Sequence, residues 1–236
     1  MIQVQPIPGL AHLPYAEVWI ESADEALLAE ALAAAAAIGK PGLEIWTTTK
    51  TPEVAPFLEA RGYEEVRRYV ISELDVAAAA EPPAPRHELT TFAERPDLAD
   101  ELYEVALESY PDQPGRAGSV IGGGTVDGWR AWGLDPHPPD AYFIAVEDGQ
   151  VLGYGYIEKH DGEWSHGFMA IRRAARGRGI ATSLKHAQIA WAKANGVPAL
   201  RTATETRLVQ MRALNDRLGY VRLYDEVILR GPGIVT

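Results

Sequence analysis

The sequence predicts an α/β protein, because helical and strand-like patterns alternate along its 236 residues. An Ala- and Leu-rich run over 24–38 is followed by an apolar, strand-like run over 43–48. A short helical pattern over 52–60 and a second strand-like run over 63–74 repeat this alternation. Further along, Asp148-Gly149 lies between two apolar runs, which is the pattern of a tight β-hairpin. Helices and strands are therefore both expected throughout the chain.

A Pro-rich segment, AAAAEPPAP over 77–85, divides the chain. Its prolines disfavour both helix and central strand, so we interpret this segment as a linker. The sequence therefore predicts a small domain over 1–76, a linker over 77–87 and a larger domain over 88–236.

The larger domain is expected to open with a helix near 96–109. The run Gly122 to Gly124 predicts a flexible lid or a disordered connector. Asp161-Gly162 predicts a second hairpin turn. The strands expected around these turns are 142–147, 151–159 and a strand that ends near Ile171.

Composition excludes several functional classes. With no cysteine, the chain has no disulfide framework, thiolate zinc site or Cys nucleophile. A net charge of -11 disfavours nucleic acid and anionic membranes as partners and favours cationic substrates. No apolar stretch is long enough to cross a bilayer, and the N-terminus lacks a secretory pattern. These features predict a cytoplasmic protein.

The end of the chain resembles its beginning. Residues 41–63 align without gaps with 198–220, so that Pro, Leu, two Thr, Gly and Tyr coincide, and Gly39 falls on Gly196 in the same register. We interpret this similarity as a duplication. The alternative is a chance likeness of two strand-helix-strand units, since Gly commonly follows a helix.

The clearest chemical signal lies between Ile171 and Gly196. A strand ending at Ile171 is followed by a loop with Gly177 and Gly179, and then by an amphipathic helix from about Ile180. Glycines at such a junction let backbone N–H groups approach a phosphate, and the helix dipole favours an anion. The loop is too short for a Walker or GxGxxG motif, so another phosphate carrier is expected. The alternative is a tight turn with solvated arginines.

The run Arg176 to Ala181 resembles the acetyl-CoA loop of the GNAT acetyltransferases, Arg/Gln-x-x-Gly-x-Gly/Ala, at every defined position. The resemblance covers about 88–230, includes LNDRLGY over 214–220, and is greatest to the tandem-GNAT group that contains mycothiol synthase. It implies a GNAT fold with a central mixed, largely antiparallel sheet flanked by helices, splayed where acetyl-CoA enters. The implied cofactor-binding residues are Met169, Ala170, Ile171, Arg176, Gly177, Arg178, Gly179, Ile180, Ala181, Thr182 and Asn215.

The N-terminal copy lacks this loop. The repeat register places Glu21 to Asp24 where the second copy has Arg178 to Ala181, and acidic side chains there would repel a diphosphate. We therefore expect a degenerate, partial GNAT-like repeat with no second active site.

Four residues are candidates for catalysis. In GNAT enzymes the base is often a carboxylate on or near the strand before the cofactor loop, where Glu163 and His166 lie, with Glu158 on the preceding strand. Each could instead be an exposed hairpin residue, and their spacing matches no helix-based zinc motif, so no metal is expected. Asn215 occupies the slot of the tyrosine acid found in many GNAT enzymes, where it could donate a hydrogen bond but no proton.

Substrate contacts are expected from the first helices of the larger domain and the loop after them. Aromatic walls with one carboxylate would suit a small molecule that carries an amine. The tryptophans among these residues could equally belong to the core. The candidates are Tyr110, Asp112, Trp129 and Trp132.

The sequence thus predicts an N-acetyltransferase that moves an acetyl group from acetyl-CoA directly to a primary amine. The alternatives are an inactive protein that binds or senses acyl-CoA, and a purely structural α/β domain. The identity of the amine, the acyl chain and the oligomeric state stay open at this point.

Overall fold

The computed structural model describes residues 2–7, 13–113 and 121–231. The chain forms two compact units. Unit 1 comprises residues 1–71, 204–209 and 222–236, and unit 2 comprises 72–203 and 210–221. In the described part of the chain, no helix combines the length and the apolar character that a membrane span requires.

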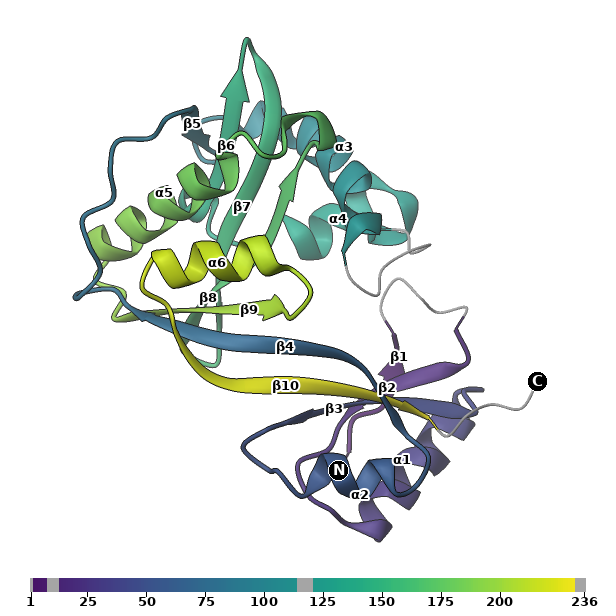
Figure 1. Cartoon of the computed structure of the whole chain (residues 1–236). Coiled ribbons are helices and arrows are strands. Elements are labelled where there is room, and N and C mark those ends of the chain that lie inside the picture. The colour runs from purple at the N-terminus through teal and green to yellow at the C-terminus, as the bar shows by residue number, and fades with distance from the viewer. Residues whose placement is uncertain (1, 8–12, 114–120, 232–236) are drawn as a thin grey trace. The chain divides into compact units, whose positions relative to one another are not determined.

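Unit 1 has a sheet with helices packed against it (Figure 1). β2 and β3 run parallel, and β10 pairs antiparallel with β3. Asp24 caps α1, where its carboxylate accepts hydrogen bonds from the N–H groups of Ala26 and Leu27. In the order β1-β2-β3-β10-β4, the strands are β1 (Gln5–Pro6), β2 (Tyr15–Trp19), β3 (Gly42–Thr48), β10 (Val221–Gly231) and β4 (Glu64–Asp75); the helices are α1 (Glu25–Ala37) and α2 (Val54–Glu59).

A strand from the end of the chain completes the sheet of unit 1. β10 follows α6, yet its residues 226–231 pair with β3. Conversely, Ser72–Asp75 of β4 belongs to unit 2, where β4 neighbours β9. Val227 and Leu229 of β10 are buried in the core of unit 1. Unit 1 therefore depends on residues from both ends of the chain.

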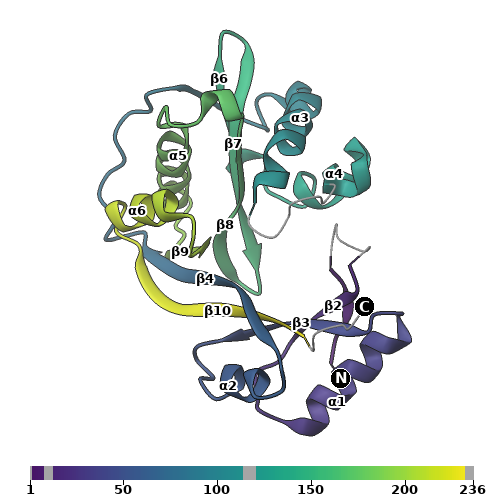
Figure 2. The ribbon, with the colours of Figure 1, turned by 45° about the vertical axis from the view of Figure 1, so that its right-hand side comes forward.

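Unit 2 is a mixed sheet with the strand order β4-β9-β8-β7-β6-β5. Figure 2 shows α3 and α4 on one face of this sheet and α5 and α6 on the other. β5 to β8 are antiparallel, and β8 and β9 are parallel. The strands are β5 (Glu88–Thr91), β6 (Tyr142–Glu147), β7 (Gln150–His160), β8 (Glu163–Ile171) and β9 (Ala199–Glu205); the α-helices are α3 (Ala99–Ser109), α4 (Val126–Gly133), α5 (Ile180–Ala194) and α6 (Val209–Arg217).

The structure confirms the predicted fold class and both hairpin turns. Asp148 and Gly149 have φ angles of 49° and 78°, and Asp161 and Gly162 have 48° and 87°. Positive φ at both central residues is the requirement of a type I′ turn, which matches the twist of the strands that it joins. The first turn joins β6 to β7, and the second joins β7 to β8, the strand that leads to the predicted cofactor loop.

The glycine run at Gly122 corrects one expectation, since it forms a 3-10 turn (η3, Ile121–Gly124) rather than an unstructured connector. A Cβ on Gly122 would lie 2.2 Å from the backbone nitrogen of Trp129, so only glycine permits this packing against α4. Residues 114–120, just before it, lie outside the described part of the chain. β2, β5 and α4 were not anticipated from the sequence.

We predict that residues 1–76 alone will not melt cooperatively and will bind no CoA. Without β10, the sheet lacks the strand between β3 and β4, and the core lacks Val227 and Leu229. Circular dichroism on heating and calorimetry with CoA measure the two properties. A fragment that melts sharply or binds CoA would contradict the dependence on β10.

Candidate functional site

The site begins where β8 and β9 separate. In the described structure, these strands share only the pair Ser165 and Arg201. Beyond Ser165, the edge of β8 that faces β9 continues to Ile171 without a paired strand. Because backbone N–H and C=O groups require partners, such an edge is suited to an extended ligand. Met169, Ala170 and Ile171, the predicted pantetheine contacts, lie along it.

A β-bulge marks the inner part of this edge. The register between β7 and β8 shifts between Gly155 and Ile157, which pair with Met169 and His166. A Cβ on Gly167 would lie 1.9 Å from the ring of Tyr156, so this position also requires glycine. The bulge re-aims the side chains of β8 next to the point where the sheet opens.

The predicted cofactor loop follows β8 through a short 3-10 turn, η5 (Arg173–Ala175). Gly177 and Gly179 have φ angles of 76° and 84°, which are left-handed values that favour glycine. Gly179 is the N-cap of α5 and provides no side-chain cap, so the first N–H groups of the helix are open to an acceptor. The nearest atom to a Cβ on Gly179 would be His87 Cε1 at 4.0 Å. The loop therefore offers backbone donors and space for an anion.

The loop arginines are held by carboxylates. Asp112 forms ion pairs with Arg173 at 2.8 Å and Arg176 at 2.7 Å, and Arg178 pairs with Glu147. Hydrogen bonds from Arg173 and Arg176 lower the pKa of Asp112 to about 2. The structure places Asp112 beside the predicted cofactor loop, and its predicted substrate contact stays a prediction. There it can orient Arg176 for a phosphate.

A polar cluster lies on the α5 side of β8. His166 Nδ1 is 2.9 Å from Gln188 Oε1, and its Nε2 contacts the hydroxyl of Tyr220. Burial, with the charge of Lys185, holds the pKa of His166 well below its usual range. The neutral ring therefore donates a hydrogen bond through Nδ1 to Gln188 and accepts one through Nε2 from the hydroxyl of Tyr220. Both nitrogens of His166 are engaged.

Glu158 lies on the opposite face of the sheet. It shares the α3 side with Tyr154 and Tyr156, because alternate residues of a strand point to the same face. Its carboxylate is 3.9 Å from His137 and from His160. Burial raises the pKa of Glu158, while the charge of His160 and a hydrogen bond from Ser165 oppose this shift. A partly buried carboxylate with a raised pKa has the properties expected of a general base.

The remaining candidates are distributed over unit 2. Glu163 is exposed next to the hairpin turn and pairs with Arg201. Asn215 is buried on α6, where its backbone carbonyl accepts hydrogen bonds from the backbone N–H groups of Leu218 and Tyr220. Trp129 is fully buried between Tyr103 and Tyr154, so a substrate could contact it only after rearrangement. The roles of these residues stay predictions.

Tyr110 and Trp132 form an aromatic edge on the α3 and α4 side. Their ring centroids are 6.3 Å apart, and Tyr110 also meets Phe168 of β8 at 6.0 Å. Tyr110 is buried and Trp132 is exposed, so a ligand could reach Trp132 directly. Among the residues that the structure describes, no group of three His, Asp or Glu side chains is arranged to hold a metal ion.

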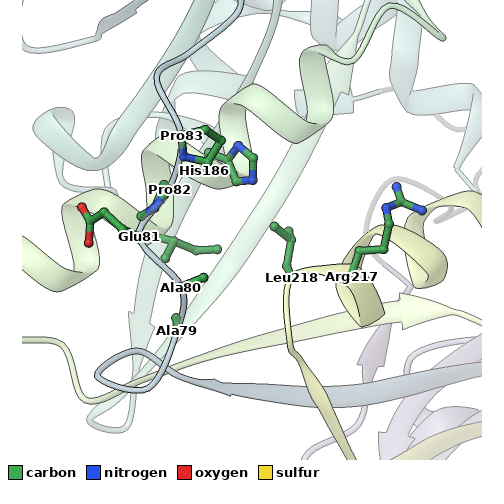
Figure 3. A pocket seen from close by; sticks show the side chains of 9 residues that line it. Ala79, Ala80, Glu81, Pro82, Pro83, His186, Arg217 and Leu218 are labelled. Atoms are coloured by element: carbon green, nitrogen blue, oxygen red, sulfur yellow. The ribbon is translucent and has the colours of Figure 1, made fainter.

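A small cavity of about 120 Å³ lies elsewhere, where residues 79–83 of the linker cross α5 and the end of α6. Figure 3 shows His186 on one side and Leu218 and Arg217 on the other. Ligand pockets usually measure roughly 300 Å³ or more. This cavity is therefore too small for CoA.

Sequence reasoning missed the polar residues on the buried face of α5. Lys185 and Gln188 are both buried, and Ser183 bonds His87 Nδ1 at 2.9 Å. The available signal was their spacing, since they fall on the same side of a predicted amphipathic helix as apolar residues. Their partners come from distant parts of the sequence and could not be read from it.

Comparison with protein families matches residues 97–220, more than half of the chain, to the acetyltransferase (GNAT) family. A search of curated proteins finds no match. The matched range contains β8, the cofactor loop, α5 and α6.

Solved structures of this fold are similar over nearly the whole chain. A GCN5-related N-acetyltransferase from Sphaerobacter thermophilus has 20% identity and a TM-score of 0.70, covering 99% of this chain and 77% of that one. A tandem GNAT protein from the clavulanic acid biosynthesis pathway has 20% identity and a TM-score of 0.68, covering 94% and 77%. A GCN5-related N-acetyltransferase from Kribbella flavida has 17% identity and a TM-score of 0.60, covering 93% of this chain and 81% of that one. At these identities, the likeness concerns the fold.

We predict that Gly179→Val abolishes CoA binding, whereas the wild-type chain binds about one CoA. The valine side chain would occupy the open space over the first N–H groups of α5. Isothermal titration calorimetry gives affinity and stoichiometry.

Gly196→Val is the matched control. Gly196 follows the other end of α5, has a φ of 66° and has open space around it, so valine causes comparable backbone strain there. Loss of CoA binding in both variants would assign the effect to α5 stability and not to the loop.

Proposed function

The chain belongs to the acetyltransferase (GNAT) family, and on this premise we propose that it transfers an acetyl group from acetyl-CoA to a primary amine of a small molecule. The family implies acyl transfer from an acyl-CoA. The observation that carries the finer proposal is the open edge of β8, which leads into a loop of exposed backbone donors. The β8 edge suits an extended arm that carries amide groups, and the loop suits a diphosphate.

Acetyl-CoA would bind in a fixed direction. Its diphosphate would lie on the N–H groups of 177–182, with Arg176 adding charge-assisted hydrogen bonds. Its pantetheine arm would follow β8 inward from Ile171, and the distance to His166 is about 16 Å at the rise of a strand. The thioester would then lie near the bulge. Bound acetyl-CoA supplies the activated acyl group for the transfer.

We assign the base to Glu158. An amine becomes nucleophilic only after losing its proton, and a partly buried carboxylate with a raised pKa can accept one. Glu163 is a weaker candidate because it is exposed and paired with Arg201. His166 is also weaker, because its two nitrogens are already engaged by Gln188 and Tyr220.

The acceptor would enter from the α3 and α4 side, where Glu158 lies. Trp132 and Tyr110 offer an aromatic edge there, which can attract a cationic amine. The net charge of -11 favours the approach of a cation in the same way.

Unit 1 would have a structural role. It contains the first repeat, whose Glu21 to Asp24 replace the loop of the second repeat. Ser22 forms a bend before α1, and Asp24 uses its carboxylate to cap that helix, so the N-terminus of α1 already has an acceptor. We infer a degenerate GNAT-like copy, as in a tandem GNAT protein resembling mycothiol synthase, with one cofactor site in the chain.

The second candidate is a protein that binds acyl-CoA without turnover. It would require the same β8 edge and loop but no base, and Asn215 in the tyrosine slot is the residue that favours it. CoA release from acetyl-CoA in the presence of a panel of primary amines distinguishes the two. Binding without any release across the panel would favour the sensor.

We predict that Glu158→Gln lowers kcat/KM for the amine about 10²-fold, because glutamine cannot accept a proton. In the wild type, activity should fall as the pH drops through the raised pKa of Glu158, since only the ionised carboxylate is a base. Glutamine should remove this acid limb. A pH series of initial rates measures both effects.

Glu163→Gln tests the rival carboxylate on the neighbouring strand, with the same change of charge. If the glutamine at 163 lowers the rate more than the one at 158, the base is assigned to the wrong residue. CoA affinity, measured in parallel, should be unchanged in both variants.

A further inference from the structure

Lys185 lies in the interior of unit 2, and no acidic side chain in the described part of the chain forms an ion pair with it. It lies on α5 with 2% of its surface exposed. Its Nζ has no hydrogen-bond partner among the residues that the structure describes. Burial of an unpaired cation is costly, so such a side chain is rarely retained in a core without a function.

The groups that face Lys185 come from three elements. Its Nζ lies 5.1 Å from the ring centroid of Tyr220, which follows α6. The hydroxyl of Tyr220 contacts His166 of β8, and Gln188 of α5 contacts the same imidazole. His166 is neutral and Tyr220 is protonated near neutral pH, because burial lowers the pKa of the first and raises that of the second. The described surroundings therefore leave the cation uncompensated.

The position of Lys185 follows from helix and strand geometry. Five residues beyond Ile180 place its Cα about 8 Å along α5 from the phosphate-binding end. Its side chain reaches the Tyr220 ring, beside the His166 end of the open β8 edge. On the proposed function, this is the end where the sulfur of the thioester would lie.

We propose that Lys185 receives the leaving sulfur of CoA, pairing with the thiolate and giving it a proton. This inference rests on the proposed acetyl transfer. The amine nitrogen attacks the thioester carbon and forms the C–N bond. The C–S bond breaks, and its electron pair goes to sulfur. Glu158 takes the first proton of the substrate ammonium before the attack and passes it to water. After the attack it takes the second proton from the amide nitrogen, while one proton moves from Lys185 Nζ to sulfur; exchange with water then restores both groups.

The alternatives on the same side of β8 are poorer acids. Asn215 has no proton to give near neutral pH, and the Tyr220 hydroxyl is already donated to His166. Burial lowers the pKa of Lys185 to about 7, so this ammonium can release a proton at neutral pH. Its charge also stabilises the thiolate before the proton moves.

Base and acid would then lie on opposite faces of one strand edge. Glu158 projects to the α3 side, and Lys185 comes from α5 on the other side. The nucleophile would approach the thioester carbon from one face, and the sulfur would leave toward the other. This arrangement keeps the two titrating groups apart, so that they do not neutralise each other.

The test compares CoA with desulfo-CoA, in which hydrogen replaces the thiol. We expect the wild type to bind CoA at least about tenfold more tightly than desulfo-CoA at mildly alkaline pH, as one charge-assisted contact provides. Lys185→Met should abolish this difference, and Lys185→Arg should keep it. In the wild type and in Lys185→Arg, the ultraviolet absorbance of the CoA thiolate should appear at a lower pH for bound CoA than for free CoA. In Lys185→Met, this shift should be absent.

Lys193→Met is the matched control, because Lys193 lies on the same helix but bonds the carbonyl of Ala79 at 2.6 Å. It should leave the preference for CoA unchanged. In turnover assays, Lys185→Arg should lose the alkaline limb of the kcat profile, since arginine does not titrate there.

The outcomes separate this inference from the proposed function. Equal affinity of the wild type for CoA and desulfo-CoA, with an unshifted thiol, overturns the role of Lys185 and leaves acetyl-CoA binding intact. Failure of both ligands to bind overturns the proposed function itself. If thermal melting shows that Lys185→Met does not fold, the affinities of the wild type for CoA and desulfo-CoA and the titration of the bound thiol still test the role of Lys185.

Discussion

The separation of β8 from β9 after one residue pair is the constraint on which the rest of the candidate site depends. Two adjacent parallel strands would normally satisfy each other's backbone groups. Here β8 is held on its other side by β7 and at its end by Ser109, whose hydroxyl donates to the Ile171 carbonyl at 3.1 Å. The edge therefore keeps its place in the sheet although it is unpaired toward β9. On the proposed function, this edge leads a ligand to the loop glycines and the N-terminus of α5.

The second constraint is the use of strands from distant parts of the chain, and it concerns stability. β10 fills the sheet of unit 1, while the end of β4 belongs to unit 2. Unit 1 thus buries Leu229 from the end of the chain, and unit 2 buries Leu74 from the strand that follows α2. Loss of such a side chain typically costs about 2–5 kcal/mol. The N-terminal segment can therefore be required for folding whether or not it binds a ligand.

Local signals carried most of the successful prediction. The helix that begins near Asp24 and the two Asp-Gly turns depend on a few adjacent residues with a fixed backbone preference. The features that sequence reasoning did not predict are non-local. The ion pairs of Asp112 with Arg173 and Arg176 join residues far apart in the chain. The pairing of β10 with β3, the opening beside Ser165 and the surroundings of His166 likewise depend on distant residues, which periodicity cannot bring together.

The same reasoning explains why Lys185 was overlooked. On an amphipathic helix, a lysine is expected to extend its stem along the apolar surface and keep its charge in water. That expectation fails when neighbouring elements cover the ammonium group. Here the ring of Tyr220 lies over it. An isolated buried cation is tolerated if a ligand brings the missing anion, because the desolvation cost is then offset in the complex. The unpaired lysine and the open edge of β8 therefore support one interpretation, a site whose charge balance is completed by CoA.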